Sequence, residues 1–316
     1  MTSSAASTSA SSARCELMLD YHRELLNDEL RTNAFRAAIA KTVRPGDVVI
    51  DLGCGSGILS FFACQAGAAR VYAIDATRMA DVATFLARHL GFADRITVIQ
   101  KESRNVELPE RANVLISETL GVTGFDEGIA GSVQDARARL LTADARIIPC
   151  RLGVSLVPVE LDYDYDRHVA FWSEQRYGLD LSPMRLFASN SIAFAHIRSN
   201  TYLAPPAEMF SLAIGDGTEG SGQARFTVQR DGFLHGFGAF FTTTLAEGIT
   251  LTNARARETS WSQALLPLEV PVQVHEGALI DVELQMDDGR AWRWRGDAAG
   301  EAFDQTTWLS MPPPGM

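Results

Sequence analysis

The sequence predicts an α/β protein of two parts, a parallel-sheet domain followed by an antiparallel, barrel-like domain. In the first half, short apolar runs alternate with helical segments, the pattern of a parallel sheet covered by helices on both faces. After Pro149, alternating strand-like segments replace the helices, which is typical of an antiparallel sheet or barrel. A chain of 316 residues, 46% of them hydrophobic, has the length for two domains and enough apolar side chains for their cores.

The expected elements of the first half alternate between strand and helix. Apolar residues recur at roughly helical spacing from Glu16 to Ala40, and Pro45-Gly46 ends that pattern. The expected strands are Val48–Asp51, Val71–Asp75, Ile96–Ile99, Val114–Ser117 and one that begins at Arg146–Ile148. The expected helices are Ile58–Ala66, Ala76–Leu90 and Glu127–Leu141, of which the first two are closed by glycines.

The second half shows hairpin signals and one unusual insert. Asp231-Gly232 and Asp288-Gly289 each lie between apolar runs, which indicates two hairpins. The glycine-rich stretch Gly215–Gly222 is expected to be a flexible loop. The insert from about Phe171 to Asn200 is richer in Trp, Tyr and Leu than a surface loop, so we expect it to pack on another surface.

The amino terminus does not belong to either domain. Residues 1–13 are nearly all Ser, Thr and Ala, and we expect a disordered tail there. They have neither a basic start nor an apolar run, which argues against a secretory signal, and no apolar run in the chain approaches the length of a membrane span. The first domain, with its N-terminal helix, is then expected at 14–148 and the second at 149–316.

Charge and cysteine content narrow the function classes. The net charge of -11 argues against general nucleic-acid binding and suits a cationic partner. The cysteines lack the spacing of a zinc site and are too few for a disulfide scaffold, so we expect no metal and a reducing, cytoplasmic compartment. They are Cys15, Cys54, Cys64 and Cys150.

A glycine-rich turn follows the first expected strand and indicates a cofactor. The pattern Gly53-Cys54-Gly55-Ser56-Gly57 lets the backbone approach a ligand and directs helix N–H groups toward it. Asp75 ends the second strand, where an acidic residue can accept hydrogen bonds from ribose hydroxyls. The alternatives are a tight strand–helix turn without a ligand, and an Asp75 that caps the helix beginning at Ala76. These residues alone do not separate NAD from S-adenosylmethionine.

Two glutamates, Glu118 and Glu127, indicate a site for a cation. They flank a glycine-containing stretch that follows the fourth strand. Two carboxylates can balance the charge of a guanidinium and match its planar fork with bidentate hydrogen bonds. The alternative is that Glu118 simply ends a strand and Glu127 starts a helix, where an anion is favourable.

The segment Val49–Ser60, with Asp75, resembles motif I and the following acidic position of class I methyltransferases. More specifically, the chain resembles the protein arginine methyltransferase family over most of its length. Four segments carry this resemblance in the family's order. They are a cofactor-covering helix at His22–Thr32, a double-glutamate loop at Ile116–Glu127, the start of a dimerisation arm at Trp172–Asp180, and a Thr-His-Trp loop at Thr259–Gln263.

The resemblance implies S-adenosyl-L-methionine as cofactor, bound by a Rossmann-like domain. It implies that Arg31 pairs with the cofactor carboxylate, that the motif I turn lies under the methionine portion, and that Asp75 binds the ribose. The implied cofactor-binding residues are Arg31, Asp51, Gly53, Gly55, Gly57, Asp75, Glu102 and Ser103. Arg104 stands where the family usually has a glutamate at the adenine end.

The resemblance also implies the residues of methyl transfer. Glu118 and Glu127 are the catalytic pair, and Asp28 is a third candidate that in the family pairs with the histidine of the Thr-His-Trp loop. Here Ser260 replaces that histidine, and a serine cannot act as a general base near neutral pH. The implied pocket-lining residues are Leu25, Ile129, Ser260 and Trp261, of which Leu25 and Ile129 stand where methionines are common and Trp261 has core packing as its alternative.

Three functions remain open from the sequence. The chain methylates a guanidino nitrogen of free arginine or a similar metabolite, or methylates arginine side chains in proteins, or is a silent dimeric scaffold. The first is favoured because the departures from the family cluster at the cover helix and acceptor pocket, and because a bias for arginine over lysine suggests a GC-rich bacterial source. The resemblance further implies a homodimer whose helical arm, at about 171–200, docks on the second subunit, without nucleic-acid or membrane partners.

Overall fold

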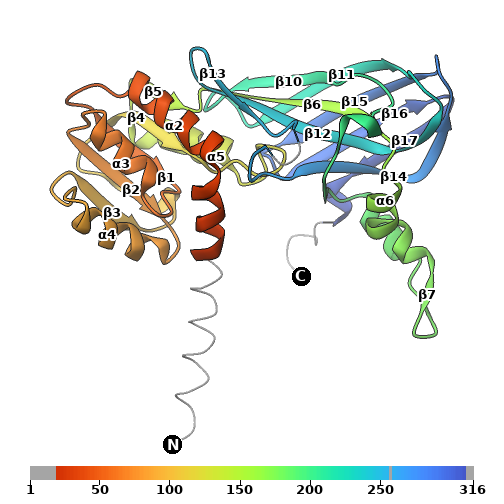
Figure 1. Ribbon diagram of the computed structural model, residues 1–316, viewed down its shortest axis with the longest axis horizontal. Coiled ribbons are helices and arrows are strands. Elements are labelled where there is room, and N and C mark those ends of the chain that lie inside the picture. The colour runs from red at the N-terminus through yellow and green to blue at the C-terminus, as the bar shows by residue number, and fades with distance from the viewer. Residues whose placement is uncertain (1–18, 256–257, 311–316) are drawn as a thin grey trace, which may run out of the picture. The chain divides into compact units, whose positions relative to one another are not determined.

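The computed structural model describes residues 19–255 and 258–310, and the tail expected at 1–13 lies outside these residues (Figure 1). The chain divides into two compact units. The first comprises the chain up to Thr119 together with Ser132–Cys150 and Thr244–Leu251. The second comprises Leu120–Gly131, Arg151–Thr243 and the chain from Thr252 onward.

The first unit is built on a five-stranded sheet in the order β3-β2-β1-β4-β5, in which every pair of neighbours is parallel. Its strands are β1 (Val48–Leu52), β2 (Arg70–Asp75), β3 (Ile96–Gln100), β4 (Ala112–Ser117) and β5 (Leu141–Ile148). Its helices are α2 (Glu29–Thr42), α3 (Ile58–Gln65), α4 (Met79–His89) and α5 (Ile129–Arg139), the last beginning in the second unit. The predicted Rossmann-like α/β architecture is confirmed.

Central strands of this sheet are buried almost from end to end. Val49 and Ile50 of β1, and Leu115 and Ile116 of β4, have no exposed surface. Helices pack on the sheet, so β-branched and leucine side chains can point to both faces without meeting water. This burial explains why continuous apolar runs, rather than alternating ones, located these strands in the sequence.

Several helix boundaries differ from the expectation. The N-terminal helical stretch is interrupted at Asp28, which leaves one helix at 19–27 and makes Asp28 the N-cap of α2, where its side chain accepts from Arg31 N. Helix α4 begins at Met79, later than expected, because a turn occupies 76–78. Leu141 was expected at the end of a helix, but it begins β5, since α5 ends at Arg139.

The second unit contains two main antiparallel sheets, as predicted. The larger, in the order β10-β6-β12-β14-β9 with β13 beside β12, is made of β6 (Arg151–Val159), β9 (Ala193–Ala195), β10 (Ala207–Ala213), β12 (Gly232–Ala246), β13 (Ile249–Thr252) and β14 (Gln263–Val274). The smaller, in the order β11-β15-β16-β17, is made of β11 (Glu219–Thr227), β15 (Leu279–Asp287), β16 (Ala291–Ala298) and β17 (Glu301–Thr306). Figure 1 shows these strands running across the unit.

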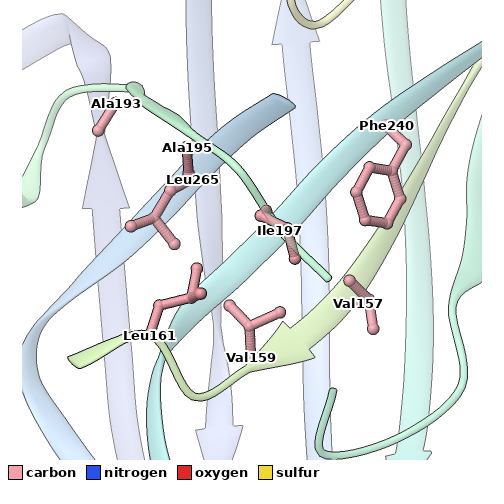
Figure 2. Close-up of a cluster of buried hydrophobic side chains, with 8 residues drawn as sticks. All are labelled: Val157, Val159, Leu161, Ala193, Ala195, Ile197, Phe240 and Leu265. Carbon is pink, nitrogen blue, oxygen red and sulfur yellow. The ribbon is translucent and has the colours of Figure 1, made fainter. Parts of the chain in front are cut away.

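A cluster of buried side chains joins four strands of the larger sheet to the segment beside them. Figure 2 shows valine, alanine, phenylalanine and leucine side chains of β6, β9, β12 and β14, together with Leu161 after β6 and Ile197 after β9. The members are Val157, Val159, Leu161, Ala193, Ala195, Ile197, Phe240 and Leu265. Because Leu161 precedes the insert and Ala193 follows its last helix, this cluster fixes both ends of the insert on the sheet.

Of the two predicted hairpins, one is confirmed and one is wrong. Asp288-Gly289 turns β15 into β16, and both residues have the positive φ that such turns require, 49° and 67°. Asp231-Gly232 leads into β12, whose sheet does not contain the preceding β11, so no hairpin forms there. The loop expected at Gly215–Gly222 is shorter than that, because β11 begins at Glu219. A Cβ on Gly222 would overlap the Met209 carbonyl, so glycine at this position lets the backbones of residues 222 and 209 approach closely.

The insert forms an arm that projects from the second unit (Figure 1). It consists of the 3-10 helix η2 (Ala170–Ser173), a small hairpin of β7 (Gln175–Arg176) and β8 (Leu179–Asp180), and α7 (Met184–Ser189), so it is less helical than expected. The helix α6 (Asp162–His168) precedes it, and Tyr165 Oη in α6 donates to Glu269 O on β14 at 2.7 Å. Several large apolar side chains of the arm are exposed, namely Phe171, Tyr177, Leu179, Met184, Leu186 and Phe187.

Candidate active site

The predicted cofactor residues of the first unit gather at one edge of its parallel sheet. They follow the carboxyl ends of neighbouring strands, which is where ligands bind in open α/β sheets. The glycine turn follows β1, Asp75 ends β2, Glu102 and Ser103 follow β3, and Glu118 follows β4. Strand order, rather than sequence proximity, therefore brings these residues together.

The glycine turn has a backbone that only glycine adopts readily. Gly53, Gly55 and Gly57 have φ of 73°, 52° and 84°, in the left-handed region. Gly57 is also the N-cap of α3 and, having no side chain, leaves the first N–H groups of that helix without a side-chain cap. A turn of this kind can present backbone N–H groups to a ligand at close range.

Asp75 is tied to this turn and does not cap α4. Its Oδ2 accepts from Gly55 N at 2.9 Å, and its Oδ1 accepts from Thr77 N at 2.8 Å and Thr77 Oγ1 at 2.6 Å. The N-cap position of α4 belongs to Arg78, so the alternative role considered for Asp75 is wrong. The carboxylate is held beside the glycine turn, as a ribose acceptor requires.

Asp51 supplies a buried acceptor beneath the turn. Its side chain is fully buried at the end of β1, and Ser60 Oγ donates to Oδ2 at 2.6 Å. Burial raises the pKa of Asp51 to about 7, against the opposing effect of the Ser60 hydrogen bond. Within the described part of the chain Oδ1 has no hydrogen-bond partner, which fits a site that receives a donor from a ligand.

His22 belongs to this site, although the sequence assigned it no role. Its ring lies over the glycine turn, so that a Cβ on Gly55 would be 2.5 Å from His22 Cε1. Burial lowers the pKa of His22, with Asp75 raising it and Arg31 lowering it further. His22 is the first residue of the segment that resembles a cofactor-covering helix, which placed it near a cofactor. Its packing on Gly55, 33 positions away, could not be predicted because it depends on the tertiary fold.

Arg31 and Glu118 form a buried ion pair between Arg31 Nη2 and Glu118 Oε2. Their side chains are 10% and 9% exposed. Arg31 Nη1 also donates to Leu25 O at 2.9 Å, and Asp28 Oδ1 accepts from Arg31 N at 2.9 Å. The predicted carboxylate-binding arginine and the first predicted catalytic glutamate are thus neighbours, with half-buried Leu25 beside them.

Glu127 and three of the predicted pocket residues, Ile129, Ser260 and Trp261, belong to the second unit. Glu127 is exposed and precedes α5, which begins at the fully buried Ile129, so Glu127 does not start a helix. The loop before it is shaped internally by Asp126, whose carboxylate accepts from Val122 N at 3.1 Å, Thr123 N at 2.8 Å and Thr123 Oγ1 at 2.6 Å.

The predicted Thr-Ser-Trp segment contacts the same loop. Trp261 Nε1 donates to Leu120 O at 2.7 Å, and the indole packs edge-on against Phe241 at a centroid distance of 5.0 Å. Trp261 is partly exposed and Ser260 is exposed, so neither is ordinary core. Asn253, which the sequence did not single out, adds further hydrogen bonds to this region.

Other site types find little support in the described residues. Between residues 19 and 310, leaving out 256–257, no group of three or more His, Cys, Asp or Glu side chains could hold a metal ion. None of the helices in that part of the chain is long and apolar enough to cross a membrane.

Comparison with known families gives two matches. Residues 153–299 match the family model of the arginine methyltransferase oligomerization subdomain, and residues 32–121 match that of the ribosomal protein L11 methyltransferase. The second match covers the strands and turns at the cofactor edge of the first unit.

Curated relatives share about a third of their aligned residues with this chain. Protein arginine N-methyltransferase 2 of Mus musculus is 34% identical over 83% of this chain and 63% of its own length, so the chain spans under two thirds of that relative. The Homo sapiens protein of that name is 32% identical, with coverages of 87% and 68%. Protein arginine N-methyltransferase 6 of Xenopus tropicalis is 31% identical, with coverages of 87% and 86%.

Two solved structures share the fold. The PRMT1 enzyme–prozyme heterotetrameric complex with AdoHcy of Trypanosoma brucei superposes with a TM-score of 0.80 at 24% identity, covering 90% of this chain and 96% of the matched one. Protein arginine methyltransferase 10 of Arabidopsis thaliana gives 0.76 at 24% identity, with coverages of 91% and 97%. At this identity the likeness concerns the fold alone.

Proposed function

The chain belongs to the protein arginine methyltransferase family, and from this premise we propose that it methylates a guanidino nitrogen of arginine side chains in peptides or proteins. The names of the relatives favour a protein substrate over free arginine, which the sequence had favoured, and give no support to the bacterial source inferred with it. The observation that carries the proposal is the buried Arg31–Glu118 pair at the cofactor edge of a methyltransferase sheet.

The residues at the sheet edge fit S-adenosylmethionine, which supplies an activated methyl group on a sulfonium when bound. The orphaned Oδ1 of Asp51 suits the cofactor's ammonium group, and the carboxylate of Asp75 suits its ribose hydroxyls. The turn at Gly53 and Gly55, over which His22 lies, is our assignment for the methionine portion. Glu102 and Ser103 remain our assignment for the adenine end.

Glu118 and Glu127 are proposed to receive the substrate guanidinium. A guanidinium has a pKa of about 12.5–13.8 and therefore enters the site charged, with a delocalised lone pair that makes it a weak nucleophile. Two carboxylates balance that charge, hold the planar fork by charge-assisted hydrogen bonds and direct one terminal nitrogen toward the methyl group. Arg31 pairs with Glu118 and orients its carboxylate.

The proton of the methylated nitrogen needs an acceptor other than residue 260. Ser260 stands where the family has histidine, and a neutral hydroxyl does not take a proton near pH 7. Asp28 caps α2 and is largely buried, whereas Glu127 is exposed to solvent. We therefore assign proton transfer to Glu127 and water, and keep Asp28 as a residue that holds Arg31.

The arm supports a homodimer as the working assembly. Tyr177 is fully exposed and Leu179 is 60% exposed at the tip of the hairpin, where a monomer would leave them in water. The match of residues 153–299 to an oligomerization subdomain points the same way. The proposed partner is a second copy of this chain, whose arm docks on the first unit and braces the N-terminal helix. The retained glutamates argue against a purely structural scaffold.

One experiment tests the substrate class. The protein is incubated with S-adenosylmethionine and equal arginine concentrations of free arginine and an arginine–glycine-rich peptide, followed by mass spectrometry. We expect methylated peptide and no methylated free arginine. Methylated free arginine alone would reverse the substrate assignment, and no methylation of either compound would refute the proposed activity.

A further inference from the structure

Asn253 is a buried amide that hydrogen-bonds the loop that carries Glu127 and two other segments. It follows β13, is 0% exposed, and lies within the second unit. Its Oδ1 accepts from Phe241 N at 2.8 Å, and its Nδ2 donates to Val122 O and Ser262 O, both at 2.8 Å. An amide has one acceptor oxygen and two donor hydrogens, so each of these three functions has a backbone partner.

These partners belong to three different segments. Phe241 lies on β12, Val122 lies in the glutamate loop, and Ser262 follows Trp261 in the Thr-Ser-Trp segment. The two backbone carbonyls lie at Nδ2 and the backbone N–H lies at Oδ1, so these partners fix which way the Asn253 amide is turned. Few other side chains of this size can join one backbone donor to two backbone acceptors.

Trp261 and Asn253 hold alternate carbonyls of the glutamate loop. Trp261 binds Leu120 O at 2.7 Å, and Asn253 binds Val122 O. Asp126 fixes the same loop from the inside through the N–H groups of residues 122 and 123. Both the carbonyl and the N–H of Val122 are therefore bonded, which limits the freedom of the backbone five residues before Glu127.

We propose that Asn253 is a positioning residue for Glu127 in methyl transfer. By fixing the path of the loop, it presents the second carboxylate to the guanidinium in one orientation. This inference rests on the proposed function, because it concerns the efficiency of that reaction. The hydrogen bonds of the Asn253 side chain go to Phe241, Val122 and Ser262, all in the second unit, so we expect it to contribute to turnover and peptide binding rather than to cofactor affinity.

The second unit offers a matched control. Asn190 is 3% exposed, and it also joins segments through its amide, since Nδ2 donates to Leu186 O at 2.7 Å and Oδ1 accepts from Thr306 N at 2.6 Å. It lies at the end of α7 and bonds no residue of the glutamate loop. Asn253→Ala and Asn190→Ala remove comparable buried hydrogen bonds, so they separate positioning of the loop from general stability.

The test compares kcat, the KM for an arginine–glycine-rich peptide, and the Kd for S-adenosylmethionine. We expect Asn253→Ala to lower kcat about tenfold or more, because a displaced catalytic group loses alignment, while the cofactor Kd stays within about twofold. Asn190→Ala should keep kcat within about twofold of the wild type once light scattering has shown that it has the same assembly as the wild type, because Asn190 caps α7 of the arm. Thermal unfolding identifies a temperature at which all the proteins are folded.

Each outcome has a defined meaning. If Asn253→Ala does not fold, Asn253→Ser, which keeps one donor, takes its place and should give an intermediate kcat. Unchanged kcat in the folded Asn253 variant, or an equal loss in Asn190→Ala, would overturn the positioning role. A wild-type protein without any methylation activity would instead refute the proposed function.

Discussion

Replacing Asp51 by Asn should stabilise the protein in alkaline solution. Asp51 is fully buried, and burial raises its pKa from 3.8 to about 7. Above pH 7 the folded chain must keep this carboxylate ionised in an apolar setting, whereas an amide of the same shape stays neutral. The interval between 3.8 and about 7 corresponds to roughly 4 kcal/mol, an upper bound on what the variant can gain.

The pH dependence fixes the sign of this prediction. A group whose folded pKa is raised contributes stability that is complete below the unfolded value and is lost as the pH rises through the folded value. The advantage of Asp51→Asn should therefore be largest above pH 7 and should shrink between pH 7 and about pH 4. The assay is urea denaturation at several pH values between these limits. The free energy of unfolding of the variant is compared with that of the wild type at each pH.

Asp47→Asn is the matched control with the opposite sign. Asp47 is also buried, but Arg146 Nη2 lies 2.8 Å from both of its carboxylate oxygens. Removing that charge should destabilise the protein by about 1.5–3 kcal/mol at neutral pH. Asp51→Asn should also weaken S-adenosylmethionine binding. An Asp51→Asn protein that is no more stable than the wild type at pH 8 would refute the reasoning about its burial.

Two further predictions concern the glycine turn and the arm. Gly55→Ala and Gly91→Ala both place an L-residue at positive φ, at a cost of about 1–2 kcal/mol each, but only the new Cβ of Gly55→Ala meets a neighbour, His22. By calorimetry, Gly55→Ala should therefore lose S-adenosylmethionine affinity and Gly91→Ala should keep it. Equal affinities of the two variants would contradict the proposal that the cofactor binds at the glycine turn. Leu179→Asp with Phe187→Asp, on exposed arm positions, should convert a dimer into monomers in light scattering without lowering the unfolding temperature. A wild-type protein that is already monomeric at micromolar concentration would rule out the assembly.

The strands of the first unit could be predicted because burial on both faces leaves a strong signal. Val48–Leu52 and Ala112–Ser117 were located within one or two residues at each end. The break at Asp28 was not predicted, since the apolar spacing continues across it while the backbone turns there to cap α2. The spacing of apolar residues shows which side chains face the core, and it does not reveal a single capping residue that interrupts a helix.

The two Asp-Gly pairs show the limit of local signals. Asp288-Gly289 and Asp231-Gly232 have the same residues between apolar runs, but only the first joins paired strands. A dipeptide determines which turns the backbone can adopt, whereas strand pairing is decided by packing of the whole sheet. The Asp-Gly pairs therefore predicted a turn in both places, but only Asp288-Gly289 also identified which strand pairs with the one before it.

The same limit applies to the site. Residues at strand ends, such as Asp75, could be predicted because the carboxyl edge of a parallel sheet collects them. The pairing of Arg31 with Glu118 and the packing of His22 on Gly55 could not, because they depend on where the N-terminal helices lie on the sheet. Asn253 left no sequence signal, since its partners are backbone groups that any residue carries.

The most direct test of the central claim separates cofactor binding from methyl transfer. Glu118→Gln and Glu127→Gln keep the shape of each side chain and remove the charge that we propose balances the substrate guanidinium. Calorimetry with S-adenosylmethionine and mass spectrometry of an arginine–glycine-rich peptide are performed on the wild type and both variants. We predict that both variants still bind S-adenosylmethionine and lose most peptide methylation. Methylation by both variants at near wild-type rates would contradict the account.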